Sequence, residues 1–159
     1  MMRAGKVEKR KLSPDPIYNS RLVTRFINRV MFDGKKTIAE NLVYKALDEI
    51  EKQAGKNALS VFETAIANVA PRMEVRPRRV GGASYQVPVE VRGDRREALA
   101  IRWLIAAAKS RSNKEYKTFS AKLAKELIEA SNNAGGAIKK RDDILRMAES
   151  NRAFSHFRW

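Results

Sequence analysis

Arginines gathered beside two glycines are the residues of this chain whose type and spacing best suit binding chemistry. The group comprises three arginines, the glycine pair and one tyrosine: Arg76, Arg78, Arg79, Gly81, Gly82 and Tyr85. Guanidinium groups donate paired hydrogen bonds to phosphate, and a tyrosine ring stacks on a base or a ribose. A solvated edge that deters aggregation is the alternative, but such an edge usually needs only one or two lysines. The pattern therefore favours contact with a nucleic acid.

The element that carries this group is predicted to be a β-hairpin over residues 72–92. Its second half alternates apolar and polar residues, which is the period of a strand, and the glycine pair marks the turn. A three-residue loop over 81–83 sets Val75 opposite Val89 and collects the apolar side chains on one face. A two-residue loop sets Val75 opposite Pro88 and divides them. We therefore expect the three-residue loop, with the base of the hairpin resting on helices and the tip projecting.

Helical periodicity predicts six helices on the two sides of the hairpin. They cover about residues 20–31, 37–52, 57–70, 94–108, 113–131 and 137–154. Ser20, Thr37 and Asp94 have the chemistry of N-cap residues and are expected to start three of them. Ile38 is expected to face inward from the second helix. The fourth helix is apolar almost all round, so we expect it to be central, with Trp103 in the core.

Basic residues stand at three of the predicted helix starts. They are Lys35, Lys36, Arg95, Arg96, Lys139, Lys140 and Arg141. A cation in the first turn opposes the helix macrodipole, at a cost of about 0.3–1 kcal/mol at the surface. The backbone N–H groups at a helix start, however, bind phosphate. Chance in a chain rich in bases is the alternative; we favour phosphate binding at all three starts.

The charge of the chain is large, positive and uneven. The 159 residues include 33 lysines and arginines against 18 aspartates and glutamates, which gives a net charge of +15. Residues 37–70 hold three bases and five acids, so the rest of the chain carries +17. A chain of this length forms one domain with a substantial core. The excess charge indicates a polyanionic partner that docks outside residues 37–70, which are left for solvent or protein neighbours.

Residues 1–19 are predicted to form a basic, extended arm ahead of a helical domain over residues 20–159. The bases of the arm include Arg3, Lys9, Arg10 and Lys11. A segment with so little apolar content is expected to stay disordered until it binds a partner; a terminus without a role is an equally weighted alternative. The chain is thus predicted to be mostly α: a single helical domain of about six helices, a protruding two-stranded β-hairpin arm and a disordered basic N-terminal tail.

Residues suited to catalysis or metal binding are scarce in the sequence. The chain has no cysteine and a single histidine, His156, so neither a disulfide nor a thiolate zinc site is expected. Phosphate-loop, dinucleotide and nucleophile-elbow motifs are absent from the sequence. No apolar run has the length that spans a bilayer. We therefore expect no enzymatic activity, no cofactor, no metal, no small-molecule substrate and no membrane.

Several short motifs, in one order along the chain, carry a resemblance to a known family. They are Asp15-Pro16-Ile17-Tyr18, Asp33-Gly34-Lys35-Lys36, Pro71-Arg72-Met73-Glu74-Val75-Arg76, Arg79-Val80-Gly81-Gly82-Ala83, Tyr85-Gln86-Val87-Pro88, Arg102-Trp103-Leu104 and Asn151-Arg152-Ala153-Phe154. With these motifs the whole chain resembles the bacterial family of small-subunit ribosomal protein seven, the universal S-seven family. The resemblance implies a helical domain with a protruding β-hairpin arm, located in the cytoplasm within the small ribosomal subunit.

The resemblance also implies a role and a set of partners. It implies a primary binder of 16S ribosomal RNA that nucleates assembly of the subunit head and contributes to translation. It further implies a place at the subunit interface near the exit-site transfer RNA, with messenger RNA nearby and small-subunit ribosomal proteins nine and eleven as neighbours. The residues expected near the exit-site transfer RNA are Arg78, Arg79, Gly81, Gly82 and Tyr85.

A non-enzymatic structural RNA-binding protein is the hypothesis that joins these observations, with recognition through the shape and phosphates of the RNA. The candidate residues for binding ribosomal RNA are Arg3, Lys9, Arg10, Lys11, Lys35, Lys36, Arg76, Arg78, Arg79, Arg92, Arg95, Arg96, Arg102, Lys109, Lys139, Lys140 and Arg141. A DNA-bending protein is the alternative from another class, because a β-arm with arginine and proline suits wedging into a minor groove. A nuclease is a more distant alternative.

Overall fold

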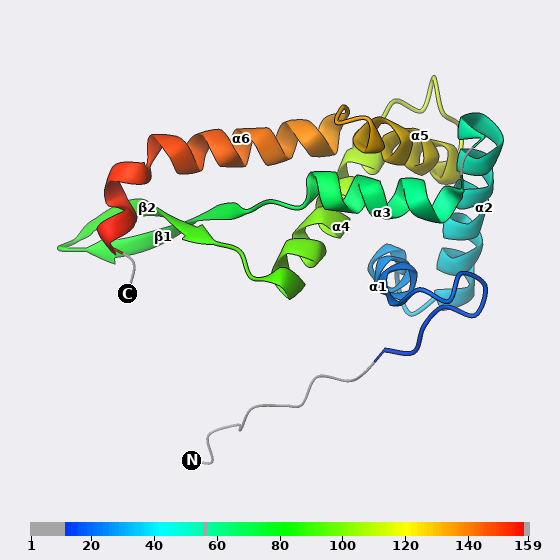
Figure 1. The fold of residues 1–159 in the computed structure, drawn as a ribbon, viewed down its shortest axis with the longest axis horizontal. Helices are drawn as coiled ribbons and strands as arrows, with labels where there is room; N and C mark the ends of the chain where they lie inside the picture. Colours follow the sequence, from blue (N-terminus) through cyan, green and yellow to red (C-terminus); the bar gives the residue numbers. More distant parts are fainter. Residues whose placement is uncertain (1–11, 56, 158–159) are drawn as a thin grey trace, which may run out of the picture.

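A computed structural model describes residues 12–55 and 57–157 of the chain. The elements are α1 (Arg21–Val30), α2 (Lys36–Ala54), α3 (Ala58–Val69), β1 (Met73–Val80), β2 (Ala83–Glu90), α4 (Gly93–Ser110), α5 (Phe119–Ser131), α6 (Gly136–Ser150) and the 3₁₀ helix η1 (Arg152–Phe157). Figure 1 shows a helical body from which the hairpin of β1 and β2 extends, with α6 running alongside it. The predicted fold class, a mostly helical chain with a two-stranded hairpin arm, is confirmed.

One apolar core joins all six α-helices. Phe26 of α1 and Phe62 of α3 are fully buried and meet edge to face, with their ring centroids 5.2 Å apart. Leu104 of α4 and Leu123 of α5 are fully buried in the same cluster. The prediction of a central fourth helix is thus correct for α4. Trp103, however, is half-buried at the edge of the core, so its predicted burial was overstated.

The first turn of α2 differs from the sequence prediction. The helix begins at Lys36, one residue before Thr37, and no side chain of the described residues caps it. Ile38 is 55% exposed, so the prediction that it faces inward is wrong, and neighbouring Ala39 takes the buried position. The buried stripe of α2 consists of Ala39, Val43, Ala46, Leu47 and Ile50, at helical spacing, and Ile38 lies one position outside it.

The starts of α4 and α5 also differ from those expected. α4 begins at Gly93 and has Asp94 within its first turn, so Asp94 is not the cap. α5 begins at Phe119 rather than near residue 113, and Thr118 is the cap because its hydroxyl accepts a hydrogen bond from a backbone N–H of the first turn. Ser20 does stand at the N-cap of α1, but its side chain makes no capping hydrogen bond.

The hairpin turns through two residues, so the predicted three-residue loop is wrong. Gly81 and Gly82 have φ values of +56° and +90°, and a tight type I′ turn needs this left-handed backbone at both central positions. Val75 consequently pairs with Pro88. The prediction assumed one apolar face, but the neighbours Val87 and Pro88, which point to opposite faces of the ribbon, are both buried. Because both faces of the ribbon are covered, the apolar side chains need not all lie on one face. The argument for a three-residue loop therefore no longer holds.

The C-terminal segment covers the hairpin beyond its base. α6 ends at Ser150, short of the predicted residue 154, and η1 then contacts β2. The ring of Phe154 in η1 lies 5.1 Å from that of Tyr85 in β2, and Figure 1 shows η1 crossing the hairpin toward its far end. The expectation that the ribbon touches the helices only through its base is therefore wrong. Arg78 and Arg79, near the tip, are nevertheless exposed.

Residues 12–19 of the predicted N-terminal arm lie against the helical body. Asp15 is 4% exposed and accepts a hydrogen bond of 2.7 Å from the hydroxyl of Tyr44 in α2. Its other carboxylate oxygen accepts the backbone N–H groups of Ile17 and Tyr18, each at 3.1 Å. This part of the chain is thus fixed by a buried acid. The candidate bases of the arm lie outside the described residues: Arg3, Lys9, Arg10 and Lys11.

Candidate nucleic-acid interface

A buried carboxylate ties the hairpin to α4. Glu74 of β1 is 7% exposed, and Nε of Arg95 in the first turn of α4 donates to both of its oxygens, at 2.8 and 3.0 Å. Arg76, two residues along the same face of β1, also donates to it. Burial raises the pKa of Glu74. The two guanidinium groups lower it by more than burial raises it, so the pKa lies below its ordinary value. Two candidate RNA-binding residues thus position the hairpin.

The start of α6 is occupied by an acidic side chain of the protein itself. Glu126 of α5 is 1% exposed, and its Oε1 accepts the N–H of Ala137 at 2.9 Å. Its Oε2 accepts a hydrogen bond of 2.8 Å from Nε of Arg111. Gly135, with φ of +96°, approaches so closely that a Cβ there would lie 3.0 Å from Oε1. The N–H of Ala137, which the phosphate hypothesis needed free, is therefore already bonded.

The basic residues that follow the start of α6 divide into two kinds. Arg141 donates from Nη1 to the backbone carbonyl of Asn68 at 2.6 Å and from Nε to Asp142 at 2.8 Å, so it joins α6 to α3. Lys139 and Lys140 are exposed. Arg141 therefore has a structural role, whereas the two lysines present their charge to solvent.

The start of α2 keeps the chemistry that predicted phosphate binding. Lys35 and Lys36 are exposed, and the first turn of the helix contains no acidic residue. Lys36 makes only a surface ion pair, at 3.5 Å, with Glu40 one turn further on. The N–H of Lys36 donates to the carbonyl of Gly34 at 2.9 Å. Among the described residues no side chain caps this helix, so the next two N–H groups, of Thr37 and Ile38, keep the capacity to bind an anion.

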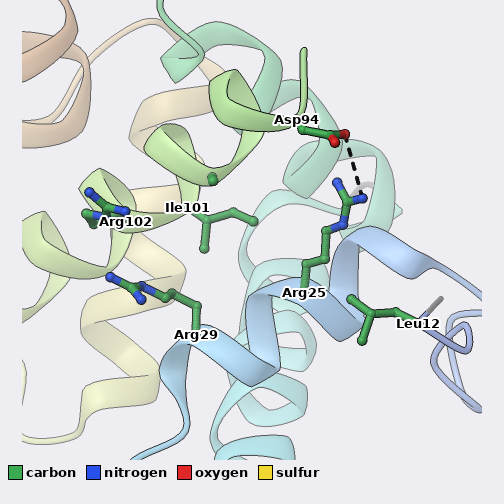
Figure 2. A pocket seen from close by; sticks show the side chains of 7 residues that line it. Leu12, Arg25, Arg29, Asp94, Ile101 and Arg102 are labelled. Carbon is green, nitrogen blue, oxygen red and sulfur yellow. Dashed lines mark ion pairs between the residues drawn. The ribbon is translucent and has the colours of Figure 1, made fainter. Parts of the chain in front are cut away.

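A basic cavity lies between α1 and α4. It has a volume of about 340 Å³, and its walls are formed by Leu12, Arg25, Arg29, Asp94, Ala98, Ile101 and Arg102. Arg25 is engaged by Glu97 and, at 4.0 Å, by Asp94. Figure 2 shows Arg29 and Arg102 extending from the two helices toward the same side of the cavity. Two guanidinium groups over an apolar floor suit a phosphate together with its sugar or base.

The sequence alone did not place Arg25 and Arg29 in the interface. The available signal was a basic residue every four positions along the first helix, a row that also includes Arg21 and is usually a solvated face. Arg102 was a candidate, but its proximity to Arg29 depends on how α1 meets α4. Only the tertiary structure brings the two together.

The remaining candidate residues lie on the surface of the hairpin and of α4. Arg78 and Arg79 near the tip of the hairpin, Arg92 before α4 and Lys109 in its last turn are all exposed. Arg96, in the first turn of α4, is half-buried, and its buried Nε makes no hydrogen bond within the described residues. Tyr85 is half-buried against η1, so its ring is only partly accessible for stacking.

The described part of the chain contains neither a metal-binding cluster nor a membrane-spanning helix. In residues 12–55 and 57–157, no three His, Cys, Asp or Glu side chains come together in a way that would hold a metal ion. No helix in these ranges has the length and apolar character needed to cross a bilayer.

The fold and this interface define a helical protein with a β-arm and a strongly basic surface, which is typical of proteins that bind structured RNA. A family model described as ribosomal protein S7p/S5e matches residues 2–152. The chain is 56% identical to small ribosomal subunit protein uS7 of Afipia carboxidovorans and 55% identical to the protein of that name from Caldicellulosiruptor bescii, with 100% of both chains covered in each case. The chain belongs to the S7p/S5e family of ribosomal proteins, as its motifs predicted.

Family membership decides between the classes of function that the sequence left open. Proteins of this family are structural, non-enzymatic ribosomal components. The expectation of a protein without enzymatic activity is therefore confirmed. The alternatives of a DNA-bending protein and a nuclease are set aside.

Proposed function

We propose that this chain binds 16S ribosomal RNA as a structural protein of the small ribosomal subunit, in the cytoplasm. One observation carries the proposal. Lys35, Arg29, Arg79 and Arg102 come from four different parts of the fold, are exposed, and form no salt bridge with any other described residue. Charge that is not neutralised within the protein is available to phosphates, and phosphate contacts dominate the affinity of such interfaces.

Internal ion pairs sort the candidate RNA-binding residues into two groups. Arg76 and Arg95 are held by Glu74, and Arg141 by Asn68 and Asp142, so these three arginines shape the protein. The second group comprises exposed bases that contact the RNA, of which Lys36 also forms a surface ion pair with Glu40: Lys35, Lys36, Arg78, Arg79, Arg92, Arg102, Lys109, Lys139 and Lys140. Structured RNA is recognised by its shape and backbone, which suits a set of cations held at fixed positions on a rigid body.

Binding to 16S RNA would nucleate assembly of the subunit head and bring the hairpin to the subunit interface. The hairpin tip would then lie near the exit-site transfer RNA, with messenger RNA nearby and small-subunit ribosomal proteins nine and eleven as neighbours. The resemblance to ribosomal protein seven supports these roles. So does the arm itself, because it extends from the body (Figure 1) and carries exposed Arg78 and Arg79.

Hydroxyl-radical footprinting of 16S RNA tests this function. The wild-type protein should protect discrete segments of the RNA backbone, and the double variant Arg29→Ala/Arg102→Ala should lose a subset of those protections. The control variant Lys45→Ala/Lys52→Ala removes two exposed cations of α2 from the net-negative part of the chain, so it should leave the pattern unchanged. A wild-type protein that protects no segment at saturating concentration would overturn the proposal.

A further inference from the structure

A groove in the net-negative part of the chain leads to an inference beyond RNA binding. It lies where the turn before α1 meets the junction of α2 and α3, and its volume is about 600 Å³. It is lined by Ile17, Tyr18, Glu51, Gly55, Asn57, Ala58 and Leu59. Ile17 is 65% exposed at its edge. One exposed apolar side chain is ordinary on a protein surface, so the inference depends on its place beside the groove and on the charges around it.

The exposure of Ile17 is imposed by the fold. The buried carboxylate of Asp15 accepts the N–H of Ile17 at 3.1 Å and is itself held by the hydroxyl of Tyr44. The backbone N–H of Asn19 donates to the carbonyl of Asp15 at 2.9 Å, which closes the turn. A partner that contacts Ile17 therefore meets a preformed surface, so little conformational entropy is lost on this side of the interface.

Carboxylates also stand close to the groove, since Glu51 lines it and the charges of Asp48 and Asp15 act on its Tyr18. Asp48 and Glu51 stand three residues apart on one side of α2, are exposed, and form no salt bridge within residues 12–55 and 57–157. Burial raises the pKa of the Tyr18 phenol, and the charges of Asp48, Glu51 and Asp15 raise it further. Lys56 stands in sequence beside the groove but lies outside the described residues; the segment 37–70 that contains it remains net negative.

We propose that this groove docks a basic, extended segment of a neighbouring protein. An apolar side chain of the segment lies against Ile17, and a lysine or arginine lies beside Glu51 and Asp48. RNA does not suit the groove, because its phosphates would meet carboxylates that form no salt bridge within residues 12–55 and 57–157. The identity of the partner rests on the proposed function, since proteins that share one RNA are themselves basic. The preference of the groove for a cationic peptide does not depend on the proposed function.

A short fluorescein-labelled peptide of alternating lysine and leucine provides the first test. Fluorescence anisotropy is measured with the full chain at physiological salt, which screens repulsion from its other charges beyond about 8 Å. Ile17→Ser and Glu51→Lys should each weaken binding by about threefold or more, the size expected of one exposed contact. Ile38→Ser and Glu63→Lys make the same chemical changes at exposed positions outside the groove and should change the affinity less than about twofold.

Two outcomes of the peptide experiment would overturn the inference. One is the absence of saturable binding to the wild-type chain. The other is an equal loss of affinity in Glu63→Lys and Glu51→Lys, because net charge alone would then explain the binding. Affinity for 16S RNA is measured in parallel. If the wild-type chain binds the peptide but does not bind 16S RNA, the proposed function is refuted and the proposal that the groove binds a basic peptide still holds.

Reconstituted small subunits provide the second test. A photoreactive amino acid at position 17 should cross-link to a lysine- or arginine-rich segment of another protein. Glu51→Lys should reduce the yield of that cross-link, and Glu63→Lys should not. A cross-link to RNA, or the lack of any cross-link in assembled subunits, would overturn the inference.

Discussion

Glu126 of α5 accepts a hydrogen bond from the backbone N–H of Ala137 in the first turn of α6, with 2.9 Å between Oε1 and the nitrogen. The same carboxylate is bonded to Arg111, which follows the last turn of α4. Lys122 is buried beside them and donates to the backbone carbonyl of Arg111 at 2.6 Å. One buried acid of α5 thus joins the C-terminal end of α4 to the start of α6. Because α6 also covers the hairpin, the carboxylate helps to set the position of the arm.

Replacing Glu126 by alanine is expected to lower the free energy of unfolding by about 3 kcal/mol. The change leaves the N–H of Ala137 without its acceptor, which costs about 1–3 kcal/mol. The upper end applies because it also leaves a cavity at a buried position and removes one of the two carboxylates bonded to Arg111, which keeps Glu129. Urea unfolding followed by circular dichroism measures the change. Glu149→Ala, at an exposed position of α6, is the control and should stay within about 0.5 kcal/mol of wild type. Similar losses in the two variants would refute the role of Glu126.

Glu74 should make the stability of the chain sensitive to acid. Burial raises the pKa of this carboxyl, but Arg95 and Arg76 bring it below its ordinary value of 4.5. A carboxylate whose pKa is depressed by folding stabilises the folded state above the unfolded pKa, and that stabilisation is lost as pH falls through the folded pKa. The free energy of unfolding should therefore fall below pH 4.5, and less steeply in Glu74→Gln. Urea melts across this acid range test the prediction, and identical pH profiles would contradict it.

The contact between Tyr85 and Phe154 should couple the hairpin to η1 energetically. A double-mutant cycle with Tyr85→Ala, Phe154→Ala and the double variant should give an interaction free energy of about 0.5–1.5 kcal/mol, as for other aromatic pairs. The measurement is the free energy of unfolding of the four proteins. Strictly additive losses would show that η1 does not hold the hairpin.

The helices and the hairpin were predictable because their signals are local. An apolar residue every three or four positions, or at every second position, marks an element wherever it lies in the fold. The register of the hairpin depended on distant residues instead. Val87 and Pro88 are both buried, and the apolar pattern of the strands alone did not show that η1, more than sixty residues after them, would help to cover the ribbon.

The candidate site was predictable as a set of residue types, and its internal partners were not. The sequence identified Arg95 and Arg141 as basic residues near helix starts, but their partners Glu74 and Asn68 come from other elements. Arg29 and Arg102 lie far apart in the sequence, so their common cavity depends on how α1 meets α4. Charge and spacing thus indicate an RNA-binding protein, whereas tertiary contacts decide which bases are free to bind.

Arg29 and Arg102 should act together on the RNA without a large effect on folding. Each phosphate contact contributes roughly 0.7–0.9 to the slope of log affinity against log salt concentration, so Arg29→Ala/Arg102→Ala should flatten the slope for 16S RNA by about 1.5. Both side chains are exposed, so the unfolding free energy should change little. Lys45→Ala/Lys52→Ala is the control that removes equal charge elsewhere. A slope equal to that of the wild-type protein would show that the cavity does not contact the RNA.

The salt dependence of the affinity of the wild-type chain for 16S RNA tests the central claim most directly. The claim is that exposed bases of the described surface bind RNA phosphates. Equilibrium affinity is measured on a 16S fragment over a series of salt concentrations. Six or more phosphate contacts would give a slope of about −4 or steeper on logarithmic axes. A slope near zero would contradict the account, because an interface without phosphate contacts could not depend on the basic residues that define it.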